Sequence, residues 1–332
     1  MTVARRDDIP QHRLGAGGPA VSALGYGAMG LSGVYGAADD AESERLIHHL
    51  VEAGITLIDT ADVYGNGHNE QLIGRALSGG LRDRVVLATK TGAGGGEGLG
   101  RPERIHQAID SSLKRLGTDR IDLYYLHRVD PSTPIEDSVG AIAEAVQQGK
   151  VGHIGISEVS ADTLRRAHSV HPIAVTQEEY SLFTRDVEAE LLPAARELGV
   201  GLVAYSPLGR GVLGGSIRSA ADVENLEGRQ ARYPRFAADA LEQNLTRVDR
   251  LRARAEELGT TPAALALGWL IAQGEDVVPI PGTRRAANLD ANLEAARLVL
   301  PAEVVAELSE IFPPGSTAGE RYTANLRGGL GR

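Results

Sequence analysis

Three side chains that can exchange protons follow short apolar runs in the first part of the sequence. Asp59 comes directly after Thr-Leu-Ile, Lys90 after Val-Val-Leu-Ala-Thr, and His127 after Asp-Leu-Tyr-Tyr-Leu. A carboxylate, an ammonium group and an imidazole held together can transfer protons and stabilise a developing charge. Each residue also has a structural interpretation, as a helix N-cap, a solvated lysine or a histidine satisfied in the core. Three such residues at equivalent positions favour a catalytic site.

Polar residues also follow the later apolar runs. They are Ser157, Gln177, Tyr205 with Ser206, and Gly282 with Thr283 and Arg284. In a barrel of parallel strands, the carboxyl ends of all strands open onto one face, where the catalytic residues of such proteins lie. We therefore expect these residues and the first three to surround one barrel mouth.

Eight short apolar runs alternate with amphipathic segments along the chain. They span residues 24–26, 56–58, 85–89, 121–126, 151–156, 173–176, 201–204 and 276–280. Strict alternation implies parallel pairing, and eight units without an interrupting linker favour a closed (β/α)8 barrel over an open doubly wound sheet. The predicted fold class is α/β, with residues 1–332 as a single TIM-barrel domain.

Local signals place the remaining segments. A glycine-rich opening over 13–22 predicts an N-terminal hairpin, and Arg101-Pro102-Glu103 predicts the start of a helix. Four glycines mark predicted helix ends, namely Gly54, Gly117, Gly149 and Gly259. The stretch 207–240 and the tail after Pro313 fall outside the eight units. We expect the tail to lie over the barrel mouth, because long loops often cover a ligand.

Several segments make the sequence similar to the aldo-keto reductase family. They are LIDTADVYGNGHNEQLIGRAL, RVVLATK, LGTDRIDLYYLHRVD, GISEVS, QEEYSLFTRD, AYSPLGRG and PIPGTRR, in the family's order, and the resemblance extends from residue 24 to residue 293. DTAxxYG, followed by the spaced lysine and the histidine of DLYxxH, is a specific signature. The opening GAMGLSGVYG and the late GERY resemble the bacterial and plant branch that includes pyridoxal reductases and perakine reductase.

The resemblance implies an activity and a role for each catalytic residue. The chain would reduce the carbonyl group of an aldehyde or ketone with a hydride from NADPH, and Tyr64 would be the general acid. Lys90 would lower the pKa of this phenol from its ordinary value of about 10, and Asp59 would hold Lys90 charged and oriented. His127 would position the carbonyl oxygen and stabilise the charge growing on it.

The resemblance also implies the residues that contact NADPH. They are Met29, Asp59, Ser157, Gln177, Tyr205, Ser206, Pro207, Leu208, Arg210, Gly282, Thr283, Arg284, Asn288 and Asn292. Tyr205 would stack on the nicotinamide ring, and Ser157 and Gln177 would bind its carboxamide. Thr283 and Arg284 would bind the adenosine 2′-phosphate, which favours NADPH over NADH.

Some positions depart from the family's commoner pattern. Glu158 replaces the asparagine that usually follows the serine, Asn288 stands where a basic residue is frequent, and Ala291 stands where a glutamate is frequent. The run GRGVLG over 209–214 matches GxGxxG, but it lies in the seventh unit and does not open a βαβ domain. We therefore reject a Rossmann interpretation of this run.

Composition limits the partners and the compartment. The 332 residues carry a formal net charge of -10, which argues against nucleic acid or an anionic membrane as the main partner. There is no cysteine and no long apolar run, so we expect a cytoplasmic protein that acts on small molecules. The histidines lack the spacing of metal ligands, and no metal is expected. The oligomeric state is open, with a monomer as the default.

Two other functions remain open at this point. A nucleotide-sensing barrel with little turnover would keep the same fold, and steady oxidation of NADPH by an aldehyde would exclude it as the main role. A barrel lyase would use Lys90 as a Schiff-base amine. The physiological substrate is undefined, because it depends on the loops after Met29, Lys90 and His127 and on the tail with Arg321 and Tyr322.

Overall fold

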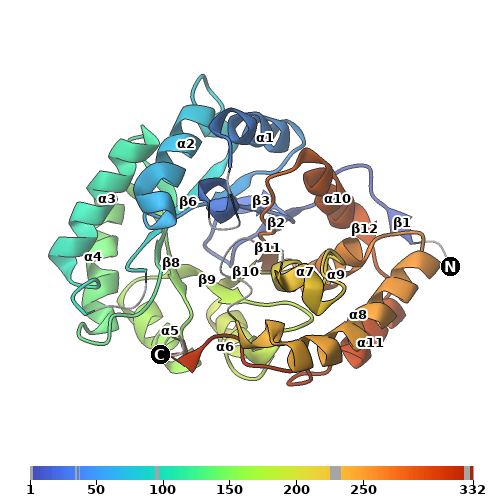
Figure 1. The fold of residues 1–332 in the computed structure, drawn as a ribbon. Helices are drawn as coiled ribbons and strands as arrows, with labels where there is room; N and C mark the ends of the chain where they lie inside the picture. Colours follow the sequence, from blue (N-terminus) through green and yellow to red (C-terminus); the bar gives the residue numbers. More distant parts are fainter. Residues whose placement is uncertain are drawn as a thin grey trace.

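The pairing of the strands defines a barrel. The structure, a computed structural model, describes residues 3–33, 36, 38–93, 97–224, 233–324 and 330–331. Within these residues one sheet contains eight parallel strands in sequence order (Figure 1). They are β4 (Tyr26–Gly27), β5 (Leu57–Asp59), β6 (Val86–Thr91), β7 (Ile121–Leu126), β8 (Val151–Ser157), β9 (Ile173–Glu179), β10 (Gly201–Tyr205) and β11 (Val277–Pro279). Val34 and Tyr35 of the GVYG segment, and parts of 207–240 and of the tail, lie outside the described residues.

Two backbone hydrogen bonds join the first strand to the segment around the last one. The N–H of Gly25 donates to the carbonyl of Pro279 at 2.9 Å, and the N–H of Gly27 donates to that of Pro281 at 3.4 Å. The two segments can approach because Gly27 lacks a side chain, since a Cβ there would lie 2.8 Å from the Ile280 carbonyl oxygen. The predicted (β/α)8 barrel is confirmed.

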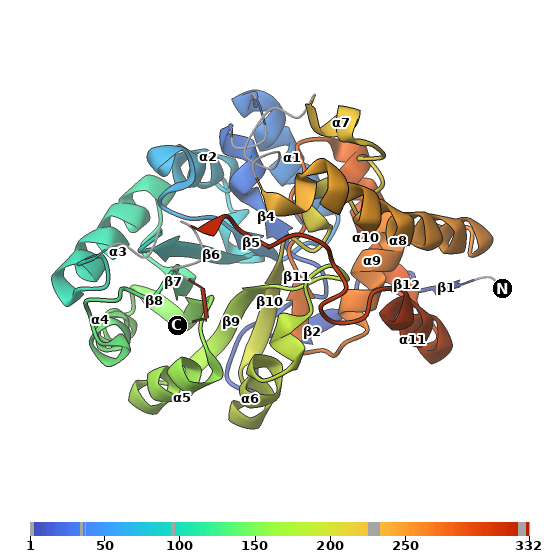
Figure 2. The same cartoon turned by 60° about the horizontal axis from the view of Figure 1, so that its bottom comes forward.

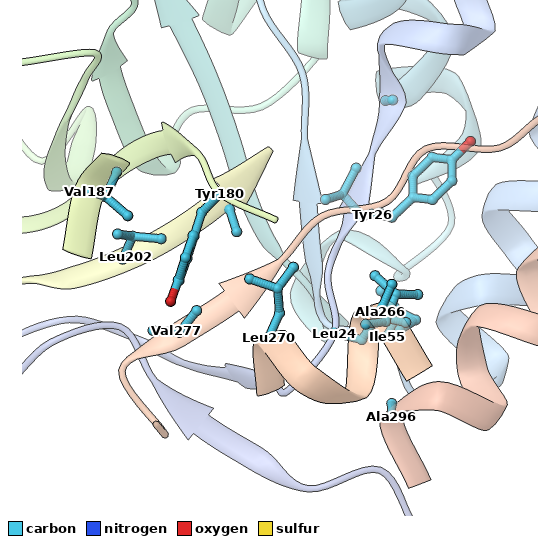
Figure 3. Packing of buried hydrophobic residues seen from close by; sticks show 14 of the residues in the cluster. Leu24, Tyr26, Ile55, Tyr180, Val187, Leu202, Ala266, Leu270, Val277 and Ala296 are labelled. Atoms are coloured by element: carbon cyan, nitrogen blue, oxygen red, sulfur yellow. The ribbon is translucent and has the colours of Figure 1, made fainter. Parts of the chain in front are cut away.

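Apolar side chains fill the inside of the barrel and the layer outside it. The inner cluster includes Leu57, Ala88, Leu123, Val175, Val203 and Val278 from the strands and Leu14 and Val21 from the N-terminal hairpin. That hairpin consists of β2 (Gln11–Arg13) and β3 (Ala20–Ser22), and its Ala16 N–H binds the Gly199 carbonyl just before β10. The predicted hairpin is therefore confirmed, and it closes the amino end of the barrel. A larger cluster lies between the strands and the helices, and Figure 3 shows part of it.

Helices surround the barrel. They are α1 (Asp40–Glu52), α2 (His68–Ala76), α3 (Pro102–Leu116), α4 (Ile135–Gln147), α5 (Ala161–Val170), α6 (Leu191–Leu198), α7 (Ala220–Glu224), α8 (Ala238–Glu257), α9 (Pro262–Ile271), α10 (Ala286–Arg297) and α11 (Ala302–Ile311). As predicted, α3 begins at Pro102, and the four glycines that follow α1, α3, α4 and α8 have positive φ. Glycine adopts this conformation without steric strain, so the local sequence ends these helices. No helix in the described ranges is both long and apolar enough to cross a membrane.

The strands that carry site residues are longer than their apolar runs. The strand predicted over 85–89 continues through Lys90, and the strand predicted over 173–176 continues through Gln177. These side chains are polar but buried, and their backbones keep the ladder, as in the pairing of Lys90 with Tyr125. Hydrophobicity therefore underestimates strand length where a strand enters the site, and the site residues lie on rigid backbone.

The C-terminal tail crosses the mouth of the barrel, as expected (Figure 2). After α11, the Thr317 hydroxyl donates to the Phe183 carbonyl at 2.8 Å. Further along, the Tyr322 hydroxyl lies 2.9 Å from that of Tyr205 at the end of β10. The tail is thus attached to the carboxyl face of the barrel at more than one point.

Candidate active site

A buried ion pair joins the ends of two neighbouring strands. Asp59 is the last residue of β5, and Lys90 lies near the end of β6. The Lys90 ammonium group binds the Asp59 carboxylate and also donates to the Thr60 carbonyl at 2.7 Å. The side chains of Lys90 and Asp59 are 0% and 3% exposed. Charges this deeply buried persist only as partners, so each residue depends on the other.

Lys90 remains a charged ammonium group in this site. Burial lowers the pKa of Lys90, but the Asp59 carboxylate and the Tyr64 phenol together raise it by more, so that it lies above its ordinary value. A Schiff base requires the neutral amine as nucleophile. The environment of Lys90 therefore argues against the lyase interpretation.

A tight turn brings Tyr64 back over the ion pair. Tyr64 begins a short 3-10 segment, in which Gly65 and Asn66 have left-handed φ values of 58° and 53°. Glycine and asparagine are the residue types that tolerate this conformation best. The Lys90 Nζ atom lies 5.3 Å from the centre of the Tyr64 ring, close enough for the ammonium group to lower the pKa of the phenol.

The pKa of Tyr64 differs from the sequence prediction. Burial raises the pKa of this phenol most strongly, and Lys90 lowers it by less, so that the net pKa lies above the ordinary value. The direction of the Lys90 effect is as predicted, but the predicted net lowering is wrong, because the sequence did not reveal how deeply the phenol is buried. Tyr64 is therefore fully protonated at neutral pH.

His127 completes the catalytic group predicted from the sequence. It follows β7, and its backbone N–H donates to the Thr91 carbonyl at 2.7 Å. Its ring meets that of Tyr64 edge to face, with centroids 6.1 Å apart. Burial, Lys90 and Arg128 hold the pKa of His127 well below its ordinary value, so the imidazole is neutral and can still donate a hydrogen bond. Its Nδ1 atom is buried without a partner among the described residues.

Arg128 is a neighbour of the site that the sequence analysis missed. Its Nη1 atom donates to the His127 carbonyl at 2.7 Å and to the Ser157 hydroxyl at 3.2 Å. The sequence signal that could have identified Arg128 is its position directly after the candidate catalytic histidine. The guanidinium group links the ends of β7 and β8 and adds a second cation to the site.

Ser157 and Gln177 connect directly to the predicted catalytic group. The Gln177 amide donates to Asp59 Oδ2 at 2.8 Å, and the Ser157 hydroxyl donates to the Gln177 carbonyl at 2.7 Å. Both side chains are buried. Gln177 thereby binds the Asp59 carboxylate oxygen that Lys90 does not contact. The structure brings these predicted residues together.

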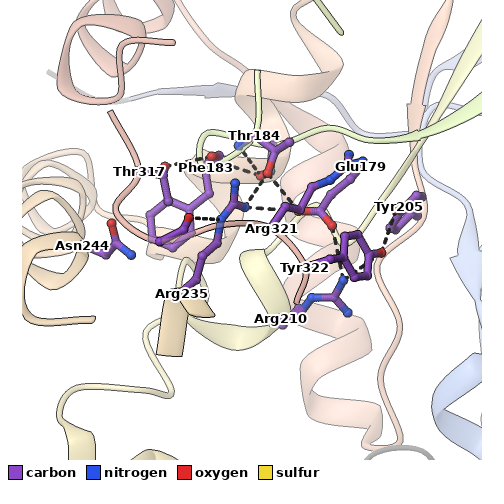
Figure 4. Close-up of polar contacts among 12 residues, drawn as sticks. Glu179, Phe183, Thr184, Tyr205, Arg210, Arg235, Asn244, Thr317, Arg321 and Tyr322 are labelled. Atoms are coloured by element: carbon purple, nitrogen blue, oxygen red, sulfur yellow. Dashed lines mark hydrogen bonds and ion pairs between the residues drawn. The ribbon is translucent and has the colours of Figure 1, made fainter. Parts of the chain in front are cut away.

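Tyr205 and the loop after it form a second group. The Tyr205 hydroxyl donates to Glu158 at 2.6 Å. The residues Ser206, Pro207 and Leu208 follow, and Arg210 then donates to Glu179 and to the Tyr322 hydroxyl, each at 3.2 Å (Figure 4). The run GRGVLG forms turns with a short 3-10 segment rather than a long helix, consistent with rejecting a Rossmann site.

The residues predicted for the adenosine end form a third group beside β4. The Thr283 carbonyl accepts from the Tyr26 hydroxyl at 2.6 Å, and a Cβ on Gly282 would lie 2.6 Å from the Gly27 carbonyl oxygen. Met29 lies in the 3-10 segment Ala28–Ser32 that follows β4. The remaining members are Arg284 and Asn288, which are exposed, and Asn292, which is buried in α10.

The three groups suit a dinucleotide on the carboxyl face of the barrel. The third group leads into the first turn of α10, and the amino terminus of a helix after the last strand of a barrel is suited to a phosphate. The exposed Arg284 adds a guanidinium group to that terminus. At the other end, the half-buried His127 ring and the half-buried Tyr64 phenol can both donate to a carbonyl oxygen. The residues present fit a phosphorylated nicotinamide dinucleotide.

Comparisons with known proteins agree with the fold and the motifs. Residues 23–312 match the model of the aldo/keto reductase family. The chain is 45% identical over 323 residues to "Probable aldo-keto reductase 1" from Glycine max, which covers 95% of this chain and 92% of that protein. It is also similar to the crystal structure of a thermostable aldo-keto reductase in complex with the inhibitor epalrestat, with a TM-score of 0.74 and 31% identity. The similarity covers 91% of this chain and 100% of that one.

Proposed function

The chain belongs to the aldo-keto reductase family of oxidoreductases, whose activity is NAD(P)H-dependent carbonyl reduction, and from this premise we propose that it reduces aldehydes or ketones with NADPH and uses Tyr64 as proton donor. The observation that supports this role is the connected set of Asp59, Lys90 and Tyr64 with the His127 ring beside them.

Each side chain contributes a separate part of the reaction. The bound cofactor, when present, supplies a hydride to the carbonyl carbon. Neutral His127 and the Tyr64 phenol donate hydrogen bonds to the carbonyl oxygen and stabilise the negative charge that develops there. Tyr64 then gives its proton to that oxygen. An alkoxide is a much stronger base than a phenolate, so this transfer is favourable even though burial raises the pKa of Tyr64.

The ion pair supports the phenolate that proton donation leaves behind. The Lys90 ammonium group stabilises this anion, and Asp59 keeps Lys90 charged inside the barrel. Gln177 holds Asp59 from the other side. In this proposal Lys90 acts mainly on the product of the proton transfer, because the phenol itself is fully protonated beforehand.

The cofactor contacts extend from Tyr64 to α10. We assign the carboxamide of the nicotinamide to Ser157 and Gln177 and its ring face to Tyr205. The pyrophosphate contacts fall to the loop Ser206, Pro207, Leu208 and Arg210. At the adenosine end, the contacts fall to Met29, Gly282, Thr283, Arg284, Asn288 and Asn292. The guanidinium group of Arg284 supports NADPH over NADH.

We also propose a family branch, a domain organisation, a location and partners for this chain. The 45% identity to a plant relative supports placing the chain in the branch that includes pyridoxal reductases and perakine reductase. We retain residues 1–332 as one domain, a cytoplasmic location, small carbonyl compounds as the partners and a monomer as the default.

The substitution Tyr64→Phe tests the proton donor. We expect it to keep NADPH affinity and to reduce the turnover of 4-nitrobenzaldehyde about 100-fold to 10,000-fold, the usual contribution of a general acid. Tyr180→Phe is the control, because it removes a phenol hydroxyl away from the site, one that donates to Glu188 at 2.8 Å. Near-normal turnover of Tyr64→Phe would refute the assignment.

A further inference from the structure

Glu158 has a backbone conformation that its residue type disfavours. It follows β8 with a φ of 56°, in the left-handed region, and it is 1% exposed. Asparagine, the residue common in the family at this position, tolerates this conformation better than glutamate. A strained residue persists only when its surroundings fix it, and such residues concentrate at functional sites. The side chain of Glu158 therefore needs contacts that explain its presence.

Those contacts come from the Glu179 backbone N–H, at 3.3 Å, from Tyr205 and from the C-terminal tail. Glu158 Oε1 accepts from the Tyr205 hydroxyl at 2.6 Å, and Glu158 Oε2 forms an ion pair with Arg321 at 2.5 Å. The side chains of Arg321 and Glu158 are 15% and 2% exposed. Asparagine is one methylene shorter than glutamate, so it would not reach both partners from the same backbone position.

The hydroxyl groups of Tyr322 and Tyr205 form a chain of hydrogen bonds in which each donor points from the Arg210 end toward Glu158. Arg210 has only donors, so the Tyr322 hydroxyl accepts from it, at 3.2 Å. The carboxylate of Glu158 has only acceptors, so the Tyr205 hydroxyl donates its single proton there. The 2.9 Å contact between the two hydroxyls must then carry the proton of Tyr322 toward Tyr205. Hydrogen bonds aligned in this way strengthen one another.

We propose that Arg321 and Tyr322 are positioning residues that fix the Tyr205 ring against the nicotinamide, Arg321 through Glu158 and Tyr322 through its direct contact with the Tyr205 hydroxyl. This inference rests on the proposed function, because it takes Tyr205 as the ring that stacks on the cofactor. Two hydrogen bonds at one hydroxyl group fix the position of the outer end of the tyrosine side chain, and the preference of the O–H group for the ring plane favours one orientation of the ring against the nicotinamide. Figure 4 shows Tyr322 between Tyr205 and Arg210.

The tail does not need these contacts to stay attached. The Thr317 hydroxyl binds the Phe183 carbonyl at 2.8 Å, and the Ala318 N–H binds the Asn244 side chain at 2.8 Å. These bonds hold the tail upstream, away from the end of β10. The contacts of Arg321 and Tyr322 with the strand ends are therefore available for a role in the site.

Two probes separate this role from a purely structural one. Tyr322→Phe removes one hydrogen bond from Tyr205, and Arg321→Lys keeps the charge but loses the planar fork of the guanidinium group. Calorimetric titration would measure the dissociation constants of NADPH and of adenosine 2′,5′-bisphosphate, which has the adenosine end but no nicotinamide. We expect the constant for NADPH to rise about threefold to tenfold, the effect of one lost hydrogen bond, with no change for the fragment.

Matched variants and a double variant complete the design. Tyr180→Phe and Arg185→Lys are the controls, since Arg185 forms a similarly buried ion pair with Glu188, at 2.8 Å. Neither control should change either constant. In Glu158→Gln combined with Arg321→Met, the loss of NADPH affinity should be smaller than the sum of the two single losses, because both substitutions remove the same ion pair.

The outcomes distinguish a failure of this inference from a failure of the proposed function. Wild-type affinity for NADPH in both tail variants would overturn the inference, and so would an equal loss of affinity for both probes, which would indicate a structural role alone. A wild-type protein that binds neither probe would overturn the proposed function, and the inference with it. Turnover by the wild type together with a selective loss of NADPH affinity in the variants would support both.

Discussion

The substitution Lys90→Met separates the structural role of the buried ion pair from its chemical role. Methionine has a similar length but no charge, so the Asp59 carboxylate would lose its cation. Asp59 would keep the hydrogen bond from Gln177, at 2.8 Å, but with its side chain only 3% exposed it has little access to water. We therefore expect two separate losses, one of stability and one of turnover.

The size of the stability loss follows from the burial of both groups. Removing one partner of a buried pair costs about 3 to 5 kcal/mol, because the other charge remains without compensation. Lys150→Met is the matched control, since the Lys150 and Asp110 side chains are 37% and 60% exposed. Exposed pairs contribute about 0 to 1 kcal/mol, so the control should be close to the wild type.

A double variant makes this prediction sharp. Lys90→Met with Asp59→Asn removes both charges, and it should recover most of the stability that the single variant loses. It should not recover turnover, which we expect to be about 100-fold to 10,000-fold below the wild type in both variants. Urea denaturation and NADPH oxidation with 4-nitrobenzaldehyde measure the two effects. A single variant as stable as the wild type, or a double variant with normal turnover, would refute this reasoning.

Three further predictions concern other parts of the chain. Burial raises the pKa of Glu178 to about 8, so the contribution of the neutral carboxyl group to stability is present at about pH 4.5 and is lost as the pH rises toward about 8. Glu178→Gln should make the stability fall less over this pH range, as measured by a series of denaturation midpoints. Equal pH slopes for the variant and the wild type would argue against a neutral Glu178. Arg284→Ala should raise KM for NADPH about tenfold or more and leave KM for NADH unchanged in steady-state assays, whereas parallel changes would contradict a 2′-phosphate contact. Gly155→Ala would place a Cβ 2.4 Å from the Tyr125 ring and should lower the free energy of unfolding by about 1 to 3 kcal/mol. Gly140→Ala in α4 is the control, because no atom lies within 4 Å of the new Cβ, and it should raise the free energy of unfolding by about 0.5 to 1 kcal/mol. An equal effect of the two substitutions would count against the close packing of β7 and β8.

The barrel and the proximity of the candidate catalytic residues were predictable because topology determines where strand ends lie. Once eight parallel strands close into a barrel, residues that follow different strands must face the same mouth. Asp59 and Lys90 are 31 positions apart, yet each directly follows an apolar run. Their contact follows from the fold class, without any knowledge of side-chain conformations.

The second group of contacts was not predictable in the same way. Glu158 and Arg321 are 163 positions apart, and the tail that carries Arg321 belongs to none of the eight units. The sequence revealed Glu158 only as a departure from the family's usual asparagine. Its contacts depend on the path of an irregular segment, which no periodic pattern determines. The net pKa of Tyr64 was missed for a related reason, because it depends on burial, which is a property of the whole barrel.

The charges at the barrel mouth bear on how an acidic protein would attract the proposed anionic cofactor. The chain has a net charge of -10, but burial raises the pKa of Glu178 to about 8, so this carboxyl group is neutral at neutral pH. Four arginines lie near the carboxyl ends of β7 to β10, namely Arg128, Arg210, Arg235 and Arg321, together with the side chains of Glu158, Glu179 and Asp186. Among these described residues the arginines outnumber the carboxylates, and such a local excess of positive charge attracts anionic ligands. One of these cations comes from the tail, which thus contributes charge as well as hydrogen bonds to the site.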